Sequence, residues 1–169
     1  MRFRELRADE IECRVSRVNS GGVELLLFKD ARCDMRILDE TVGPENWQRK
    51  HETISGVLYC SVGVFTESNG WVWKQDCGTA GNIETEKSTA SDAFKRACVN
   101  WGIGRSLYTS PRIFVYADKC RSLKPGKNGK MQCYDHFKVA KALIEDGRIK
   151  GIRIVNEDTG QIAFSWKEA

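Results

Sequence analysis

The chain has 169 residues and a net charge of +4, and 41% of its residues are hydrophobic and 30% charged. This length suits one domain with a buried core, and nowhere do about eighteen apolar residues run together, as a membrane-spanning helix requires. The charged start of the chain lacks the apolar stretch of a signal peptide. We therefore expect a soluble intracellular protein, whose small net charge would not by itself attract a polyanion.

The N-terminal segment is predicted to contain a helix followed by a strand. Residues 8–18 carry apolar side chains at helical spacing, at Ile11, Val15 and Val18, which predicts a short amphipathic helix. The Gly-rich sequence NSGG at 19–22 is expected to end this helix in a turn. The apolar run that follows, GVELLLFKD, is typical of a strand.

A second helix is predicted over 31–43, and Gly43 and Pro44 would end it. Its expected buried stripe consists of Ala31, Met35, Leu38 and Val42. Arg32 and Arg36 lie one turn apart on the other face of this helix, where Arg36 can also reach Glu40.

The central part of the chain predicts strands followed by a third helix. Residues 47–78 alternate with a period of two, which indicates an antiparallel hairpin or meander. Helical spacing returns over 86–101, and Gly102 is a natural stop. The apolar side of this helix is formed by small and aromatic residues, namely Ala90, Ala93, Phe94, Ala97, Cys98 and Trp101. Its alanines would let the helix lie close to a sheet, which would hold it rigidly.

The C-terminal third begins with a basic run and continues with strands. The run KCRSLKPGKNGK at 119–130 contains five cations and no acid. Residues 137–166 form three apolar-rich segments separated by the turn sequences EDGR and EDTG. We expect an α+β fold in which an antiparallel sheet packs against helices. Its predicted parts are a core domain over 1–118, a basic linker over 119–136 and a small β-rich extension over 137–169.

The other side of the predicted helix over 86–101 carries positive charge. Lys87, Ser91 and Lys95 follow one another at intervals of four residues, with Arg96 beside them. Cations held on a rigid helix can bind the phosphates of a nucleic acid without reading its sequence. The alternative is an ordinary solvated helix face, which is the default for charged side chains. Arg105, in the Gly-rich turn after the helix, could also reach a phosphate.

Seven cysteines form an odd set without a CxxC pair, which indicates reduced and mostly buried thiols. Cys120, Cys133 and His136 could supply three zinc ligands, but we find neither a fourth ligand nor the tight CxxC knuckle of structural zinc sites. The chain also lacks the phosphate-binding motif GxxxxGK[ST]. We therefore expect no cofactor and no nucleotide hydrolysis.

The five tryptophans, at 47, 71, 73, 101 and 166, are expected to pack in the core, because large aromatic side chains are buried on average. Trp71 and Trp73 share one strand face, however, and exposed tryptophans could stack on bases. In that alternative the chain would be a plain protector of single-stranded nucleic acid.

A metal-dependent nuclease is the enzyme alternative. Asp76, Glu84, Glu86 and Lys87 cluster in sequence where a strand passes into a helix. Two-metal catalysis requires carboxylates that converge around ions about 4 Å apart. The D/E-x-K ending usual for such sites is missing, because position 85 is Thr.

Three sequence blocks, taken in order, resemble one known family. They are DARCDMRILDETVGPENWQ, WVWKQDCGTAG and EKSTASDAFKRACVNWGIGRSLY. Together they are similar to the Rad fifty-two (Rad52) family of single-strand annealing proteins over about residues 7–116, and in particular to its short phage and prophage members. The resemblance implies a β-β-β-α core, assembly into rings, and a positively charged groove that holds single-stranded DNA around the outside.

Carried to the matching positions, the resemblance implies which residues contact DNA. The contacts that it implies are Lys95, Arg96, Lys87, Arg32 and Arg36. Arg105 and Lys74 are expected as further contacts beside them. Lys95 and Arg96 would form the floor of the groove, and Arg32 would approach from the preceding helix. Val99 stands where many relatives have another cation, one turn after Lys95. Arg105 or the basic run at 119–130 would compensate for it.

The function expected from these observations is ATP-independent annealing of single-stranded DNA in recombination and repair, not enzymatic catalysis. Fixed cations would hold one strand by its phosphates and leave its base edges free to test a second strand. Pairing would drive the reaction, because each stacked base-pair step contributes about 1.4 kcal/mol. Expected partners are single-stranded DNA, further copies of the chain in a ring, and a host or phage single-strand-binding protein or exonuclease. The expected location is the cytoplasm of a bacterial host, without membrane contact.

Overall fold

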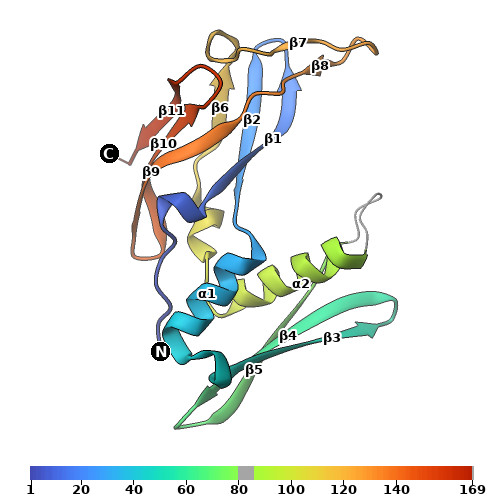
Figure 1. Cartoon of the computed structure of the whole chain (residues 1–169), viewed down its shortest axis with the longest axis vertical. Helices are drawn as coiled ribbons and strands as arrows, with labels where there is room; N and C mark the ends of the chain where they lie inside the picture. The colour runs from blue at the N-terminus through green and yellow to red at the C-terminus, as the bar shows by residue number, and fades with distance from the viewer. Residues whose placement is uncertain (80–85, 169) are drawn as a thin grey trace. The chain divides into compact units, whose positions relative to one another are not determined.

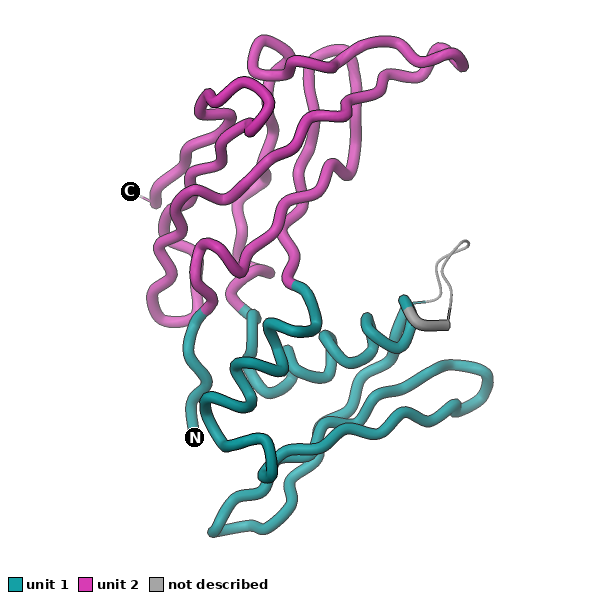
Figure 2. The backbone as a smooth tube through the Cα atoms, in the orientation of Figure 1, with its two compact units in different colours: residues 1–5, 30–105 teal, residues 6–29, 106–169 magenta. Residues whose placement is uncertain are grey.

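A computed structural model describes residues 1–79 and 86–168. In the helix that begins at Glu86, side chains are described from residue 88 onward. The chain forms two compact units, coloured separately in Figure 2. Unit 1 comprises residues 1–5 and 30–105, and unit 2 comprises 6–29 and 106–169. These boundaries differ from the predicted ones at 118 and 136, because segments distant in sequence pair within each unit.

Unit 1 consists of two helices and a three-stranded antiparallel sheet (Figure 1). Its elements in chain order are α1 (Ala31–Val42), the short 3-10 helix η2 (Pro44–Asn46), β3 (Trp47–Ile54), β4 (Val57–Thr66), β5 (Gly70–Cys77) and α2 (Glu86–Asn100). Strand β4 is central, and α2 packs against β4 and β5. The predicted meander, the predicted helix over 86–101 and the β-β-β-α order implied by the resemblance are confirmed.

The core of unit 1 lies between this sheet and α2. Alternate side chains of β4, at Cys60, Val62 and Val64, are fully buried. The helix contributes a stripe of small residues around one aromatic ring, namely Ala93, Phe94, Ala97 and Cys98, all 0% exposed. The small side chains let the helix axis approach the sheet closely, so packing against the sheet fixes the position of α2.

Helix α1 buries a different stripe from the predicted one. Its buried residues are Cys33, Asp34, Ile37 and Leu38. The prediction counted apolar residues alone, so it favoured Met35 over the neighbouring buried carboxylate of Asp34. The predicted ends are confirmed: Asp30 Oδ1 accepts a hydrogen bond from Cys33 N at 2.7 Å, and Gly43 ends the helix with a φ of 85°.

Unit 2 is built on a six-stranded antiparallel sheet in the order β11-β10-β9-β1-β2-β6. Its strands are β1 (Glu12–Asn19), β2 (Gly22–Phe28), β6 (Ile113–Tyr116), β9 (Phe137–Glu145), β10 (Arg148–Asn156) and β11 (Gln161–Lys167). The strand over 22–30 and the three C-terminal strands are therefore confirmed, as is the α+β class. The C-terminal strands belong to the same sheet as the N-terminal ones, because β9 pairs with β1 at Lys138 and Glu12.

The predicted helix over 8–18 is wrong. Residues Ala8–Glu10 form only a 3-10 turn, η1, and β1 follows. The register of β1 against β2 shifts between Val15 and Arg17, which marks a β-bulge. A bulge inserts one extra residue, so Val15 and Val18 face the same side of the strand although they are three apart. That spacing imitates a helical period.

The basic run is a hairpin rather than a plain linker. The 3-10 helix η4 (Ala117–Lys119) leads into β7 (Lys124–Pro125), which pairs antiparallel with β8 (Met131–Gln132). A further 3-10 helix, η3 (Arg105–Thr109), follows α2. Within the described part of the chain, every helix is too short or too polar to cross a bilayer.

Candidate nucleic-acid interface

Helix α2 carries two predicted contacts, Lys95 and Arg96, on different flanks, since successive positions of an α-helix are about 100° apart. Arg96 turns toward β5, where its Nε lies 3.4 Å from Oδ1 of Asp76. Lys95 is half-buried and forms no ion pair with any residue that the structure describes. The positive charge of Arg96 is thus partly balanced by a carboxylate, whereas that of Lys95 remains available.

Strand β3 adds positive charge that the sequence analysis did not identify. The guanidinium carbon of Arg49 lies 4.7 Å from the centre of the Phe94 ring, and Nε2 of His51 lies 3.0 Å from the Ala90 carbonyl oxygen. Both side chains are exposed and come from alternate positions of β3. Arg49 therefore packs on Phe94 of α2, the residue that precedes Lys95 in the chain. The consecutive basic residues RKH at 49–51 were the signal that could have identified this contribution.

Two other residues that were predicted to contact DNA, Lys74 and Arg105, bind the C-terminal end of α2. Lys74 Nζ donates a hydrogen bond to the Asn100 carbonyl at 2.9 Å and lies 4.7 Å from the centre of the Trp101 ring. Arg105 donates from Nε and Nη2 to the Val99 carbonyl, at 3.2 and 2.9 Å, and from Nη2 to the Asn100 carbonyl at 3.0 Å. The last carbonyls of a helix carry partial negative charge and lack helical partners. Both cations are therefore engaged in capping α2.

The remaining predicted contacts lie on the helices of unit 1. Arg32 and Arg36 are exposed on α1, and α1 packs against α2. Arg32 forms no ion pair within the described part of the chain. Lys87 belongs to α2, but its side chain lies outside the described residues. The structure thus brings Arg32, Arg36 and Lys95 into one compact unit.

Two tryptophans, Trp71 and Trp73, are exposed on the outer face of the β3–β5 sheet, so the expectation that the tryptophans pack in the core is wrong for this pair. Trp71 is 41% and Trp73 43% exposed. Their ring centres are 6.1 Å apart, and Phe65 lies 5.7 Å from Trp71, so three rings form one exposed cluster. The two faces of a strand alternate, and α2 packs on the face that carries Lys74. Trp71 and Trp73 consequently point to the opposite face.

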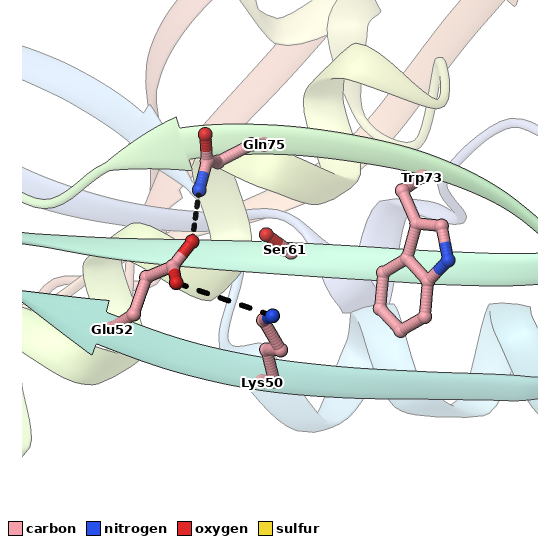
Figure 3. A pocket seen from close by; sticks show the side chains of 5 residues that line it. All are labelled: Lys50, Glu52, Ser61, Trp73 and Gln75. Atoms are coloured by element: carbon pink, nitrogen blue, oxygen red, sulfur yellow. Dashed lines mark hydrogen bonds and ion pairs between the residues drawn. The ribbon is translucent and has the colours of Figure 1, made fainter.

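A pocket on the same outer face is lined by Lys50, Glu52, Ser61, Trp73 and Gln75 (Figure 3). Gln75 Nε2 donates to Glu52 Oε1 at 3.0 Å, and Lys50 Nζ lies 4.0 Å from Glu52 Oε2. The pocket therefore combines an aromatic wall with hydrogen-bonding groups and a lysine that already has a carboxylate partner. Such a surface can accept a flat, polar, aromatic group such as a nucleobase.

The predicted zinc ligands do not come together as a set. Ligand atoms of Cys120, Cys133 and Asp135 lie within 4.8 Å of one another. His136 lies apart from that group, with Nδ1 3.1 Å from Asp158 Oδ2. The carboxylate of Asp135 already accepts four hydrogen bonds, two on each oxygen. We therefore assign Asp135 to holding the chain together and not to an open metal site.

The carboxylates of the nuclease alternative are only partly described. Asp76 is bound to Arg96, and its Oδ1 also accepts a hydrogen bond from Cys77 N at 2.8 Å. Glu84 lies outside the described residues, as do the side chains of Glu86 and Lys87. Among the described residues of this region, the partner of Asp76 is therefore an arginine and not the second carboxylate that a two-metal site requires.

A family model and two curated relatives match the chain. A family model described as Rad52/22 family double-strand break repair protein matches residues 27–122, more than half of the chain. The single-stranded DNA-binding protein DdrA of Deinococcus radiodurans is 37% identical over 99 residues, and DdrA of Deinococcus deserti is 38% identical over 93 residues. These alignments cover 57% and 54% of this chain but 47% and 45% of the relatives, so the chain spans about half their length. No solved structure matches the chain.

Proposed function

Because the chain belongs to the Rad52/22 family of double-strand break repair proteins, we propose that it binds single-stranded DNA in recombination and repair. Two relatives that are named single-stranded DNA-binding proteins support this proposal. Two observations carry it: Lys95 of α2 has no ion-pair partner among the described residues, and Arg49 of β3 packs on Phe94 of the same helix. A helix buttressed by a sheet holds these cations in place, which reduces the entropy lost when they bind phosphates.

The activity we propose is annealing of two complementary strands without ATP. Phosphate contacts position a strand without occupying its base edges, which stay free to pair. Several copies of the chain, arranged in a ring, would join the cations of their α2 helices into one track, and multivalency would make many weak contacts strong together. The resemblance to phage and prophage members and the partnership with a single-strand-binding protein or exonuclease stay predictions.

An annealing assay tests this activity. Two complementary oligonucleotides are mixed with the protein across a salt series, without ATP, and duplex formation is followed by fluorescence. We expect the protein to accelerate annealing and the double variant Lys95→Ala, Arg96→Ala to lose the acceleration. The double variant Lys138→Ala, Lys141→Ala, which removes two exposed lysines from β9 in unit 2, is the matched control. Light scattering after size-exclusion chromatography measures the size of the assembly in each sample.

The site assignment fails if the Lys95→Ala, Arg96→Ala variant anneals at the rate of the unmodified protein. The circular dichroism spectrum of the variant must match that of the unmodified protein, because a loss of fold would also stop annealing. A protein that elutes as a monomer, both alone and with DNA, would remove the ring from the proposal and leave strand binding standing.

A second candidate function is protection of a single strand by base stacking, and the exposed pair Trp71 and Trp73 favours it. Stacking of bases on aromatic rings is sequence-tolerant and contributes about 1–3 kcal/mol per base. A protector would bury the base faces that annealing needs. It would therefore quench tryptophan fluorescence strongly on binding and slow duplex formation in the same assay.

A further inference from the structure

We infer that the β7–β8 hairpin is a second phosphate-binding element, in which Lys124, Lys127 and Lys130 contact the backbone of single-stranded DNA. The hairpin belongs to unit 2, whereas Lys95 and Arg49 belong to unit 1. The inference rests on the proposed binding of single-stranded DNA. It adds a contact surface that lies beyond the family match at 27–122.

The structure divides the basic run into an anchored base and a free tip. Lys119 Nζ lies 3.9 Å from Asp118 Oδ2, and Arg121 Nη1 donates to the Asp158 carbonyl at 3.2 Å. The three lysines of the hairpin are instead exposed and form no ion pair with any residue that the structure describes. Their charge is therefore available to a partner.

The tip of the hairpin is an ordered turn. Gly126 N donates to the Lys130 carbonyl at 2.8 Å, and Gly129 N donates to the Gly126 carbonyl at 3.0 Å. Gly129 has a φ of 74°, which favours glycine, and Lys130 N donates to Asn128 Oδ1 at 3.1 Å. A closed turn presents its lysines in a limited set of positions, so less entropy is lost on binding than from a mobile tail.

The base of the hairpin is held by a buried hydrogen-bond network. The Asp135 carboxylate accepts from the backbone N of Arg121 at 2.6 Å, from the backbone N of Ser122 at 2.8 Å and from the Ser122 hydroxyl. Asn156, which is 0% exposed, donates from Nδ2 to Asp135 at 2.7 Å and to the Lys119 carbonyl at 2.9 Å. These bonds tie both ends of the hairpin to β10 and set its direction within unit 2.

The chemistry of the tip indicates what it binds. Residues 119–130 contain no acid and no aromatic side chain, so the segment offers charge without a stacking platform. Lysine ammonium groups bind phosphates as point charges and release counterions from the nucleic acid. The charge at the tip is therefore suited to the sugar-phosphate backbone.

The inference is tested by replacing the three lysines with a neutral residue of similar length. The variant Lys124→Gln, Lys127→Gln, Lys130→Gln lowers the net charge from +4 to +1. The matched control Lys138→Gln, Lys141→Gln, Lys167→Gln makes the same charge change at exposed positions of β9 and β11 in the same unit. Binding of a fluorescein-labelled oligothymidylate is measured by anisotropy at about 50 to 200 mM salt.

We expect the hairpin variant to reduce the slope of log affinity against log salt by about 2, since each single-strand phosphate contact contributes about 0.7. When salt rises fourfold, the affinity of the hairpin variant would therefore fall by a factor roughly 20-fold smaller than the factor for the unmodified protein. The control variant would keep the slope of the unmodified protein. The inference is overturned if the hairpin variant keeps the unmodified slope, or if the control changes as much as the hairpin variant. If the unmodified protein itself binds no oligothymidylate, the proposed function fails as well.

Discussion

Arg96 and Asp76 form an ion pair between α2 and β5, with Nε of the arginine 3.4 Å from Oδ1 of the aspartate. Their side chains are 39% and 27% exposed, so water reaches much of the pair, although Nε of Arg96 is itself buried. Pairs of this kind contribute about 0–1 kcal/mol. A phosphate could therefore displace the carboxylate at small cost, but Arg96 has to leave a partner in order to bind DNA, whereas Lys95 has none among the described residues.

The first prediction concerns Asp76→Asn. This change removes the competing carboxylate and one negative charge beside α2, so we expect affinity for single-stranded DNA to rise by up to about fivefold, the equivalent of about 1 kcal/mol. Anisotropy titrations of the variant and the unmodified protein at one salt concentration measure the effect. Weaker binding by Asp76→Asn would indicate that the ion pair positions Arg96 for DNA.

The second prediction compares Lys95→Ala with Arg96→Ala. The lysine substitution removes a cation without an ion-pair partner, and the arginine substitution removes one that Asp76 already balances. We expect Lys95→Ala to weaken binding more and to lower the salt slope by about 0.7. Equal losses from both variants would mean that Asp76 does not reduce the contribution of Arg96.

The third prediction concerns Arg105→Ala, which removes three hydrogen bonds to the end of α2. Because the side chain is exposed, we expect a loss of only about 1 kcal/mol in the free energy of unfolding, the contribution of one ordinary hydrogen bond. Urea denaturation measures it, with Arg32→Ala as a control, since Arg32 has no partner among the described residues. If the affinity of Arg105→Ala for DNA falls by more than its lost stability explains, Arg105 contacts DNA directly.

The fourth prediction concerns Asp135 and acid pH. Burial by itself raises the pKa of Asp135, but hydrogen bonds from the Ser122 hydroxyl, the Arg121 backbone, Asn156 and the Ser122 backbone outweigh it and lower the pKa below its usual 3.8. The folded state then binds this proton less readily than the unfolded state. The resulting stability is present above about pH 3.8 and is lost as the pH falls through the lower pKa of the folded state.

Asp135→Asn tests that linkage. The amide cannot accept all four hydrogen bonds, so we expect a loss of about 2 kcal/mol at neutral pH and a weaker decline of stability with acid than in the unmodified protein. Urea denaturation at a series of pH values from about 6 to about 2.5 measures both effects, on either side of the ordinary carboxyl pKa. Parallel acid curves for the two proteins would show that other carboxylates control acid unfolding.

The fifth prediction separates the two candidate functions through Trp71 and Trp73. If cations on α2 bind the phosphates, the double variant Trp71→Ala, Trp73→Ala keeps its affinity for single-stranded DNA within about twofold, because stacking contributes nothing there. If the outer face stacks on bases, the same variant loses at least about 30-fold, from about 1–3 kcal/mol per base. Quenching of tryptophan fluorescence in the unmodified protein provides an independent measurement.

The local sequence pattern was sufficient to predict most of the helices and strands of unit 1. The period of two over 47–78, the helical stripe around Phe94 and the stop at Gly102 depend on neighbouring residues alone, and each is confirmed. The same reasoning failed for β1, where a bulge gives Val15 and Val18 a helical spacing. A bulge forms against a partner strand, and the sequence of one strand does not show it.

The sequence by itself determined that antiparallel strands over 47–78 precede a helix that carries cations, because periodicity, turn residues and composition are properties of the chain alone. Only the tertiary structure decided which of those cations are available. Arg96 meets a carboxylate from β5, Arg105 and Lys74 bind the end of α2, and Arg49 packs on α2 from β3. Ion pairing and capping depend on distances between residues far apart in sequence, so they exist only after the chain has folded.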